Sequence, residues 1–179
     1  MLYWEMHEKK PEHMTSLNGE ALVSKTHERI AFRGLVDSLE ADLIEAQVLA
    51  MQMSDKNLCH SFGEVLDYLR LLMAAEVKES PLEPPFLFGM DEKELQIKSH
   101  ESGFVLPSYL HGVLAGRINK LRTKVRELEL FAVKVFSTET ENNPLHGDKI
   151  NRSDIVLGLN RLSSALWYLF CESINEHRQ

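Results

Sequence analysis

With 179 residues, 44% hydrophobic and 26% charged, the chain has the size and composition of one ordinary globular domain. Its formal net charge of -7 argues against a general nucleic-acid binder, because such proteins present a basic surface to phosphates. No apolar run approaches the roughly 18 residues of a membrane span, and the first residues do not resemble a signal peptide. Cys59 and Cys171 stand far apart and form no disulfide framework, which suits a reducing cytoplasm.

Two long helices are predicted in the first half of the chain. Over residues 25–53 the apolar positions recur at a spacing near 3.6, and Ser24 is the candidate N-cap. A second helix with one apolar face follows Asp55, its expected N-cap, and ends before Pro81. The prolines that cluster from Pro81 onwards then divide the chain into two helical halves.

The second half begins with a long connection, residues 80–107, which we expect to be irregular except for a short helix after Asp91. Glu94 stands three residues after Asp91, which is the spacing of a capping box. A connection of this length in a compact domain is usually functional or disordered. Beyond it the pattern predicts a long helix over residues 107–136, a polar and turn-rich stretch at 138–149, and a last long helix over residues 151–175.

These patterns together predict an all-α fold. No segment shows a convincing apolar period of two, so no sheet is expected. Four long helices and a short fifth would form a helical bundle with a ferritin-like up-down arrangement. We expect residues 1–22 to be a partly irregular N-terminal segment and residues 23–179 to form the bundle domain.

Five basic residues and no acid lie between positions 117 and 126, which locally reverses the charge of this acidic chain. On a helical wheel, Arg122, Arg126 and Glu129 fall within roughly 60° of one another at the border of the apolar arc, whereas Arg117 lies on the other side of the helix. Two partly desolvated arginines can clamp a phosphate, because the guanidinium fork matches its oxygens. A structural ion-pair network would produce the same spacing, and this alternative stays open.

Three further polar residues stand out. Lys25, in the first turn of its predicted helix, would oppose the helix dipole unless an anion binds there; a tolerated surface lysine is the alternative. Asp37, flanked by Val36 and Leu39, is expected to be partly buried and to need a partner such as an arginine. Asn160, in mid-helix at the core margin, predicts a specific hydrogen bond, either in a site or in the structure alone.

Several chemistries have no motif in the sequence. No Glu is followed three residues later by His, so the di-iron pattern of ferritin-like proteins is missing. Neither a Walker A loop nor a dinucleotide-binding glycine motif occurs. The eight histidines are scattered, and none stands at metal-site spacing from a cysteine. We therefore expect no metal-binding residues.

Five short motifs occur in order along the chain: Val23-Ser24-Lys25-x-x-x-Arg29-Ile30, Gly34-x-x-Asp37, Phe104-Val105-Leu106-Pro107, Leu121-Arg122-Thr123-Lys124-Val125-Arg126-Glu127-x-Glu129, and Leu159-Asn160-Arg161-Leu162-Ser163-Ser164. In this order and spacing they resemble the ATP:cob(I)alamin adenosyltransferases of the trimeric helical-bundle kind. The resemblance is closest to the ethanolamine-utilisation type, to which the propanediol-utilisation type is related. It extends from about residue 10 to residue 170.

The resemblance implies a transferase with a defined reaction. Corrinoid cobalt, reduced to Co(I), would attack the ribose 5′ carbon of ATP, so that adenosylcobalamin forms and triphosphate leaves. The expected substrates and cofactors are ATP, Mg²⁺ and cobalamin, and a reductase would supply the electron. The resemblance further implies a homo-oligomer, with a homotrimer preferred and a dimer left open, in a cytoplasmic location that includes association with a bacterial microcompartment. No nucleic acid and no membrane partner is expected.

The resemblance also implies roles for individual residues. Arg122, Arg126 and Phe104 would be the catalytic residues. Arg122 would also form a salt bridge with Asp37 across a subunit boundary. Phe104 would press against the lower face of the corrin and exclude the benzimidazole ligand, because an aromatic ring offers bulk and no donor to cobalt. The residues implied to bind the nucleotide or the corrinoid are Lys25, Arg29, Phe104, Arg122, Arg126, Glu129 and Asn160.

Two other functions remain as alternatives. A non-catalytic bundle that senses ATP or a corrinoid, or chaperones the cofactor, would use the same pocket but would not need Phe104. A plain interaction bundle would leave the two arginines at the core margin unexplained. Ethanolamine-type enzymes often carry a preceding segment whose histidine and clustered cysteines bind ferrous iron, and this sequence has no such cysteines. The chain is either a naturally short version or lacks that segment, so we expect no metal beyond Mg²⁺ with ATP.

Overall fold

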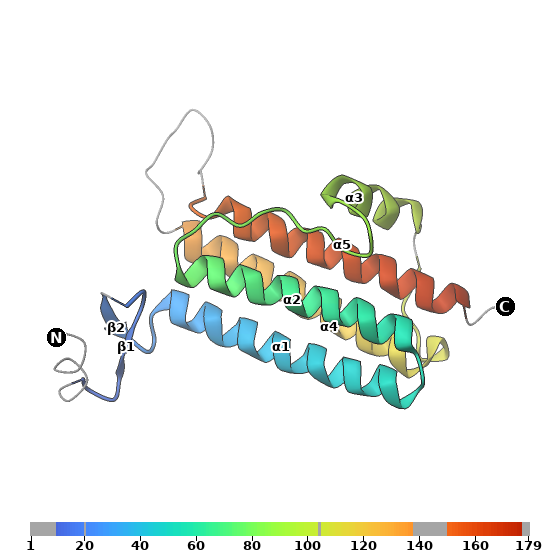
Figure 1. The fold of residues 1–179 in the computed structure, drawn as a ribbon, viewed down its shortest axis with the longest axis horizontal. Helices are drawn as coiled ribbons and strands as arrows, with labels where there is room; N and C mark the ends of the chain where they lie inside the picture. The colour runs from blue at the N-terminus through green and yellow to red at the C-terminus, as the bar shows by residue number, and fades with distance from the viewer. Residues whose placement is uncertain (1–9, 20, 104, 138–149, 177–179) are drawn as a thin grey trace.

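The computed structural model describes residues 10–19, 21–103, 105–137 and 150–176. Four long helices lie side by side, and a short helix packs against the last of them (Figure 1). The long helices are α1 (Glu28–Gln52), α2 (Lys56–Val77), α4 (Gly112–Ser137) and α5 (Ser153–Glu176), and the short helix is α3 (Glu92–Glu101). The mostly helical architecture confirms the predicted all-α class. No helix among the described residues is both long and apolar enough to cross a membrane.

The directions of the helices follow from their connections. In Figure 1, α1 and α5 run from left to right, whereas α2 and α4 run from right to left. The segment between α2 and α3 travels along the length of the bundle, so that α4 begins at the end where α2 also begins (Figure 1). This crossing segment brings the residues that follow α3 beside the middle of α4 and α5, where the candidate site lies.

The capping residues predicted from the sequence are confirmed for α2 and α3. The Asp55 carboxylate accepts the backbone N–H of Leu58 at 2.8 Å. Asp91 and Glu94 form the capping box, in which each side chain accepts the backbone N–H of the other residue. These caps depend on residues only three positions apart, so local sequence is sufficient to specify them.

The predicted start of α1 is wrong. The helix begins at Glu28 with His27 as its N-cap, whose Nδ1 accepts the backbone N–H of Arg29 at 3.2 Å. Ser24 is therefore not the N-cap, and Lys25 does not lie in the first helical turn. The reason is a small hairpin, because Ser24 pairs with Met14 as the last residue of a strand.

That hairpin consists of β1 (Met14–Ser16) and β2 (Leu22–Ser24), which pair antiparallel. The sequence did not predict it, because a three-residue strand is too short to show an apolar period of two. It also spans residues 22 and 23, where we expected the boundary between the N-terminal segment and the bundle. The stretch predicted to be turn-rich at 138–149 lies outside the described residues.

The start of α4 also differs from the prediction. The chain forms a single 3-10 turn, η1 (Tyr109–His111), capped by Ser108, before α4 begins at Gly112. Gly112 has a φ of +85°, a conformation that residues with a side chain rarely adopt. This glycine allows the chain to change direction between the 3-10 turn and α4. The helix therefore begins at Gly112 and not at Pro107.

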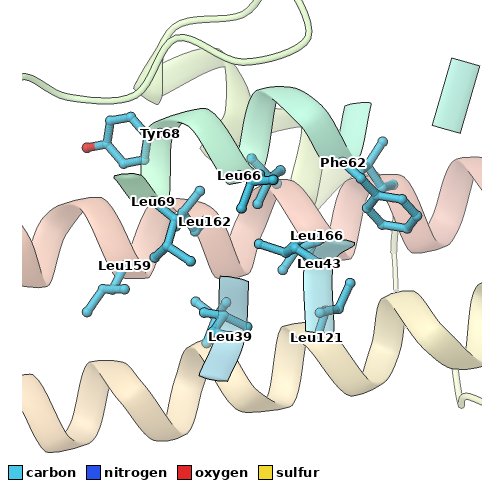
Figure 2. Close-up of a cluster of buried hydrophobic side chains, with 14 of the residues drawn as sticks. Leu39, Leu43, Phe62, Leu66, Tyr68, Leu69, Leu121, Leu159, Leu162 and Leu166 are labelled. Atoms are coloured by element: carbon cyan, nitrogen blue, oxygen red, sulfur yellow. The ribbon is translucent and has the colours of Figure 1, made fainter. Parts of the chain in front are cut away.

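The core lies where the four long helices meet. Figure 2 shows leucines from all four of them packed around one another, with Phe62 at one end of the cluster. These side chains are almost completely buried, as the 3.6-residue apolar spacing predicted. The labelled residues are Leu39 and Leu43 of α1, Phe62, Leu66, Tyr68 and Leu69 of α2, Leu121 of α4, and Leu159, Leu162 and Leu166 of α5.

A buried ion-pair network joins the start of α1 to the end of α2. Glu76 is 0% exposed, and its two carboxylate oxygens accept from Arg29 Nε at 2.6 Å and Arg33 Nε at 2.5 Å. Arg29 also donates to the backbone oxygen of Glu76 at 3.0 Å and to Glu79 at 2.9 Å. The guanidinium of Arg29 is therefore held by the end of α2 and the turn that follows it.

Glu76→Ala should lower the free energy of unfolding by about 3–5 kcal/mol, because it leaves the charge of buried Arg29 without its main partner. Urea unfolding followed by circular dichroism measures this loss. Glu79→Ala removes the exposed carboxylate of the same network and should cost less than about 1 kcal/mol. Equal losses in the two variants would contradict the assignment of Glu76 as the central partner.

Candidate functional site

The five basic residues of α4 separate into two groups according to the neighbour that they face. Arg117 donates to both carboxylate oxygens of Glu45 on α1, at 2.8 and 3.2 Å. Lys120 and Lys124 both pair with Asp42, also on α1. Each of these three cations therefore pairs with an acid of α1, and Lys120 and Lys124 share one carboxylate. Arg117 makes its ion pair on the side of α4 away from the predicted site, as the helical wheel indicated.

The other two basic residues, Arg122 and Arg126, meet no such acid in the part of the chain that the structure describes. Among the described residues neither forms an ion pair, and we call them the arginine pair. Arg122 is half-buried; its Nε and Nη2 donate to Asn119 Oδ1 at 3.2 and 3.1 Å. Its guanidinium lies over the ring of Trp167 on α5, 5.1 Å from the ring centroid. Arg126, one turn further along α4, is exposed.

Burial, and then the positive charge of Arg126, lower the pKa of Arg122. An arginine remains protonated at neutral pH after such a shift, because its unperturbed pKa is so high. The two adjacent cations repel one another, Arg122 is partly desolvated, and no described acid pairs with either, so an added anion would relieve both costs. The arginine pair therefore has the electrostatic character of an anion site, which the structural ion-pair alternative does not explain.

A pocket of about 410 Å³ opens beside the arginine pair. Its cationic lining comes from α4, and a mostly apolar part of its lining comes from the segment after α3; α3 and α5 complete it. Phe104 lies outside the described residues, but its chain neighbours Gly103 and Val105 both line this pocket. The lining residues are Ser99, His100, Gly103, Val105, Leu106, Pro107, Arg122, Arg126, Ser163, Ser164 and Trp167.

Asn160 and Glu129 meet across α4 and α5. Asn160 Nδ2 donates to Glu129 Oε1 at 2.9 Å, while Asn160 Oδ1 accepts from Arg161 Nη1 at 2.6 Å. The two contacts fix the orientation of the amide, because its oxygen faces a donor and its nitrogen faces an acceptor. The specific hydrogen bond predicted for Asn160 is thus present. Asn160 itself is exposed, so the bond lies at the surface of the bundle.

The remaining predicted residues lie apart from the arginine pair. Lys25 is exposed in the turn between β2 and α1, and Arg29 is held by Glu76 and Glu79. Asp37 is exposed on α1, so the prediction that it is partly buried is wrong. Its side chain makes no hydrogen bond or ion pair with any described residue. The helix turns Asp37 outward between its apolar neighbours, which leaves its carboxylate available to another molecule.

Sequence reasoning missed Trp167, which contacts Arg122 and lines the pocket. A signal was available, because Trp167 stands seven residues after Asn160 and two helical turns place both on one face. Trp167 was not singled out as a site residue because an aromatic side chain at helical spacing is typical of a core position. Only the packing of α4 against α5 shows that the indole faces a guanidinium.

The model of the cobalamin adenosyltransferase family matches residues 6–173, which is nearly the whole chain. The chain belongs to this family. The family resemblance predicted from the sequence is therefore confirmed.

Comparison with individual proteins extends this assignment. The chain is 31% identical over 175 residues to the corrinoid adenosyltransferase EutT of Salmonella typhimurium, with 94% of this chain and 61% of the relative covered. It is 30% identical over 174 residues to the EutT of Escherichia coli, with the same shares covered. The chain thus spans about 61% of the length of these relatives, and the ethanolamine-utilisation type of the resemblance agrees with them.

A solved structure has the same fold. It is a variant of a PduO-type ATP:corrinoid adenosyltransferase from Lactobacillus reuteri, complexed with cobalamin and ATP. The TM-score is 0.68 at 18% sequence identity, and 96% of this chain and 94% of that chain are covered. At this identity the likeness establishes the fold, and the chemistry of this family member has to be argued from its own residues.

Proposed function

We propose that this chain is a corrinoid adenosyltransferase, which transfers the 5′-deoxyadenosyl group of ATP to cob(I)alamin and releases triphosphate. The observation that carries the proposal is the arginine pair, which lacks an acidic partner among the described residues and lines a pocket that is also lined by the mostly apolar segment after α3. A polyanion and a large, mostly apolar ring system are the two kinds of ligand that such a pocket suits. Mg²⁺ would arrive bound to the phosphates of ATP.

The reaction needs no nucleophile from the protein. The electron pair of Co(I) forms the bond to the ribose 5′ carbon, and the carbon–oxygen bond to the triphosphate breaks with its electrons on the leaving oxygen. Negative charge therefore grows on the triphosphate, where Arg122 and Arg126 would stabilise it. Lys25 and Arg29 at the hairpin end, and Glu129 with Asn160, are proposed to bind the nucleotide.

The assembly and location belong to the same proposal. We propose a homotrimer whose active site lies between subunits, so that Asp37 of one copy pairs with Arg122 of the next. The exposure of Asp37 and the absence of an acid beside Arg122 in the described chain support this pairing. The bundle of residues 23–179, with a ferritin-like up-down topology, would be the catalytic domain. A reductase and a cytoplasmic, microcompartment-associated location complete the proposal.

Asp37→Lys should weaken the assembly, because it places a like charge opposite Arg122 across the proposed boundary. Analytical ultracentrifugation should show a shift towards smaller species, and activity should fall more steeply on dilution than in the unchanged protein. Glu172→Lys, a charge reversal at an exposed glutamate of α5 that forms no ion pair with a described residue, is the matched control for net charge. An Asp37→Lys protein with unchanged mass and activity would contradict the shared site.

The proposed reaction is tested directly by mixing the protein with ATP and chemically reduced cob(I)alamin. Formation of adenosylcobalamin, followed by its absorption spectrum, together with release of inorganic triphosphate, is the expected result. The alternative of a sensor or cofactor chaperone predicts binding of ATP or corrinoid without either product. Binding without turnover under these conditions would replace the enzyme proposal with that alternative.

A further inference from the structure

Trp167 lies between Arg122 and the aromatic residue Phe170. Its indole ring stacks on Phe170, with centroids 5.3 Å apart and an interplanar angle of 23°. Phe170 is only 1% exposed and is contacted in turn by the edge of His111, at 5.7 Å between ring centroids. The core therefore fixes the face of the indole that Arg122 lies over.

Asn119 fixes the same guanidinium from the side. Arg122 Nε and Nη2 both donate to Asn119 Oδ1, which lies one turn earlier on α4. The amide oxygen and the indole face together define the position of the guanidinium. Nη1 donates no hydrogen bond to any described residue, and Arg122 lines the pocket. The guanidinium is thus oriented while a donor remains available.

We propose that Trp167 is a positioning residue for adenosyl transfer, which orients the Arg122 guanidinium towards the triphosphate through its π-face. This inference rests on the proposed function. An aromatic face attracts a guanidinium without placing a full negative charge beside it. The proposed pairing with Asp37 of a neighbouring copy already places one carboxylate beside Arg122. A second carboxylate in the place of the indole would orient Arg122 equally well, but it would weaken the attraction of this cation for the leaving group. The indole therefore supplies orientation without a further negative charge.

Substitutions of Trp167 test this role by kinetics. Trp167→Leu keeps an apolar side chain and removes the π-face, and it should lower kcat roughly tenfold, the size expected for a partly buried cation–π contact. The KM for ATP should rise less, because the oriented charge matters most as the triphosphate departs. Trp167→Phe, which restores an aromatic face, should recover most of the loss.

Two further measurements separate positioning from packing. In an Arg122→Ala background, Trp167→Leu should cause no additional fall in kcat, because the group that it positions is gone. Tyr168→Leu is the matched control: this neighbouring aromatic stacks on Phe88 at 6.3 Å, and its loss should lower Tm without changing kcat. An additional fall in the Arg122→Ala background, or a Tm loss alone for Trp167→Leu, would overturn the proposal.

Fluorescence provides a readout that is independent of turnover and of any substitution at Trp167. The chain has two tryptophans, so Trp4→Phe leaves Trp167 as the only indole emitter. Inorganic triphosphate should change its emission, and Arg122→Ala should abolish that change. If this response occurs while no adenosylcobalamin forms, the proposed function fails and the positioning of Arg122 stands. If adenosylcobalamin forms without the response and without the kinetic coupling, the positioning proposal is the one that fails.

Discussion

Arg122→Ala should lower kcat for adenosyl transfer by about 10²–10³-fold, the usual loss when a preorganised contact to developing charge is removed. Arg126→Ala should have an effect of similar size, because both guanidinium groups line one pocket wall and neither has an acidic partner among the described residues. The measurement is the initial rate of adenosylcobalamin formation with cob(I)alamin supplied in reduced form. Mass measurements at the assay concentration separate this loss from dissociation of subunits.

Arg117→Ala is the matched control on the same helix. Arg117 forms an ion pair with Glu45. Removing the Arg117 side chain should therefore leave kcat within about twofold and change stability only slightly. Lys120, which pairs with Asp42, offers a second control of the same kind. Losses of equal size at Arg117, Arg122 and Arg126 would show that the site does not lie on the α5 side of α4.

Phe104→Ala is expected to impair reduction of cobalt much more than binding of ATP. The proposed role of Phe104 is to occupy the space below the corrin, so that neither the benzimidazole nor water coordinates the metal. A four-coordinate Co(II) accepts an electron more readily than a five-coordinate one, because no donor raises its axial orbital. The variant should therefore lose the spectroscopic signal of four-coordinate Co(II) in the presence of ATP. Activity should largely return when cob(I)alamin is supplied already reduced.

A purely structural role for Phe104 gives a different result. Loss of a buried phenyl ring typically costs about 3–5 kcal/mol of stability and would leave the cobalt spectrum unchanged. Urea unfolding and the Co(II) spectrum of the same preparation distinguish the two roles. Its chain neighbours Gly103 and Val105 line the pocket beside Arg122. A folded Phe104→Ala protein that retains the full four-coordinate signal would rule out the ligand-displacing role.

Much of the bundle could be predicted because it depends on local pattern. The caps at Asp55 and Asp91, and the buried leucine faces of the long helices, follow from residues within a few positions of one another. The starts of α1 and α4 could not be predicted in this way. Pairing of Ser24 with Met14 and the positive φ of Gly112 decide those boundaries, and neither produces an apolar periodicity.

By itself, the sequence determined the all-α class, the family motifs and the cluster of five basic residues on one helix. It could not determine which of those charges stay available. Glu45 and Asp42 are separated in sequence from Arg117 and Lys124 by 72 and 82 residues, and only the packing of α1 against α4 brings them together. The opposite side of α4 packs against α5, which offers Arg122 an indole face in place of a carboxylate. The tertiary structure thus decided which basic residues of α4 find an acidic partner within the described chain, because ion pairing depends on distance in space.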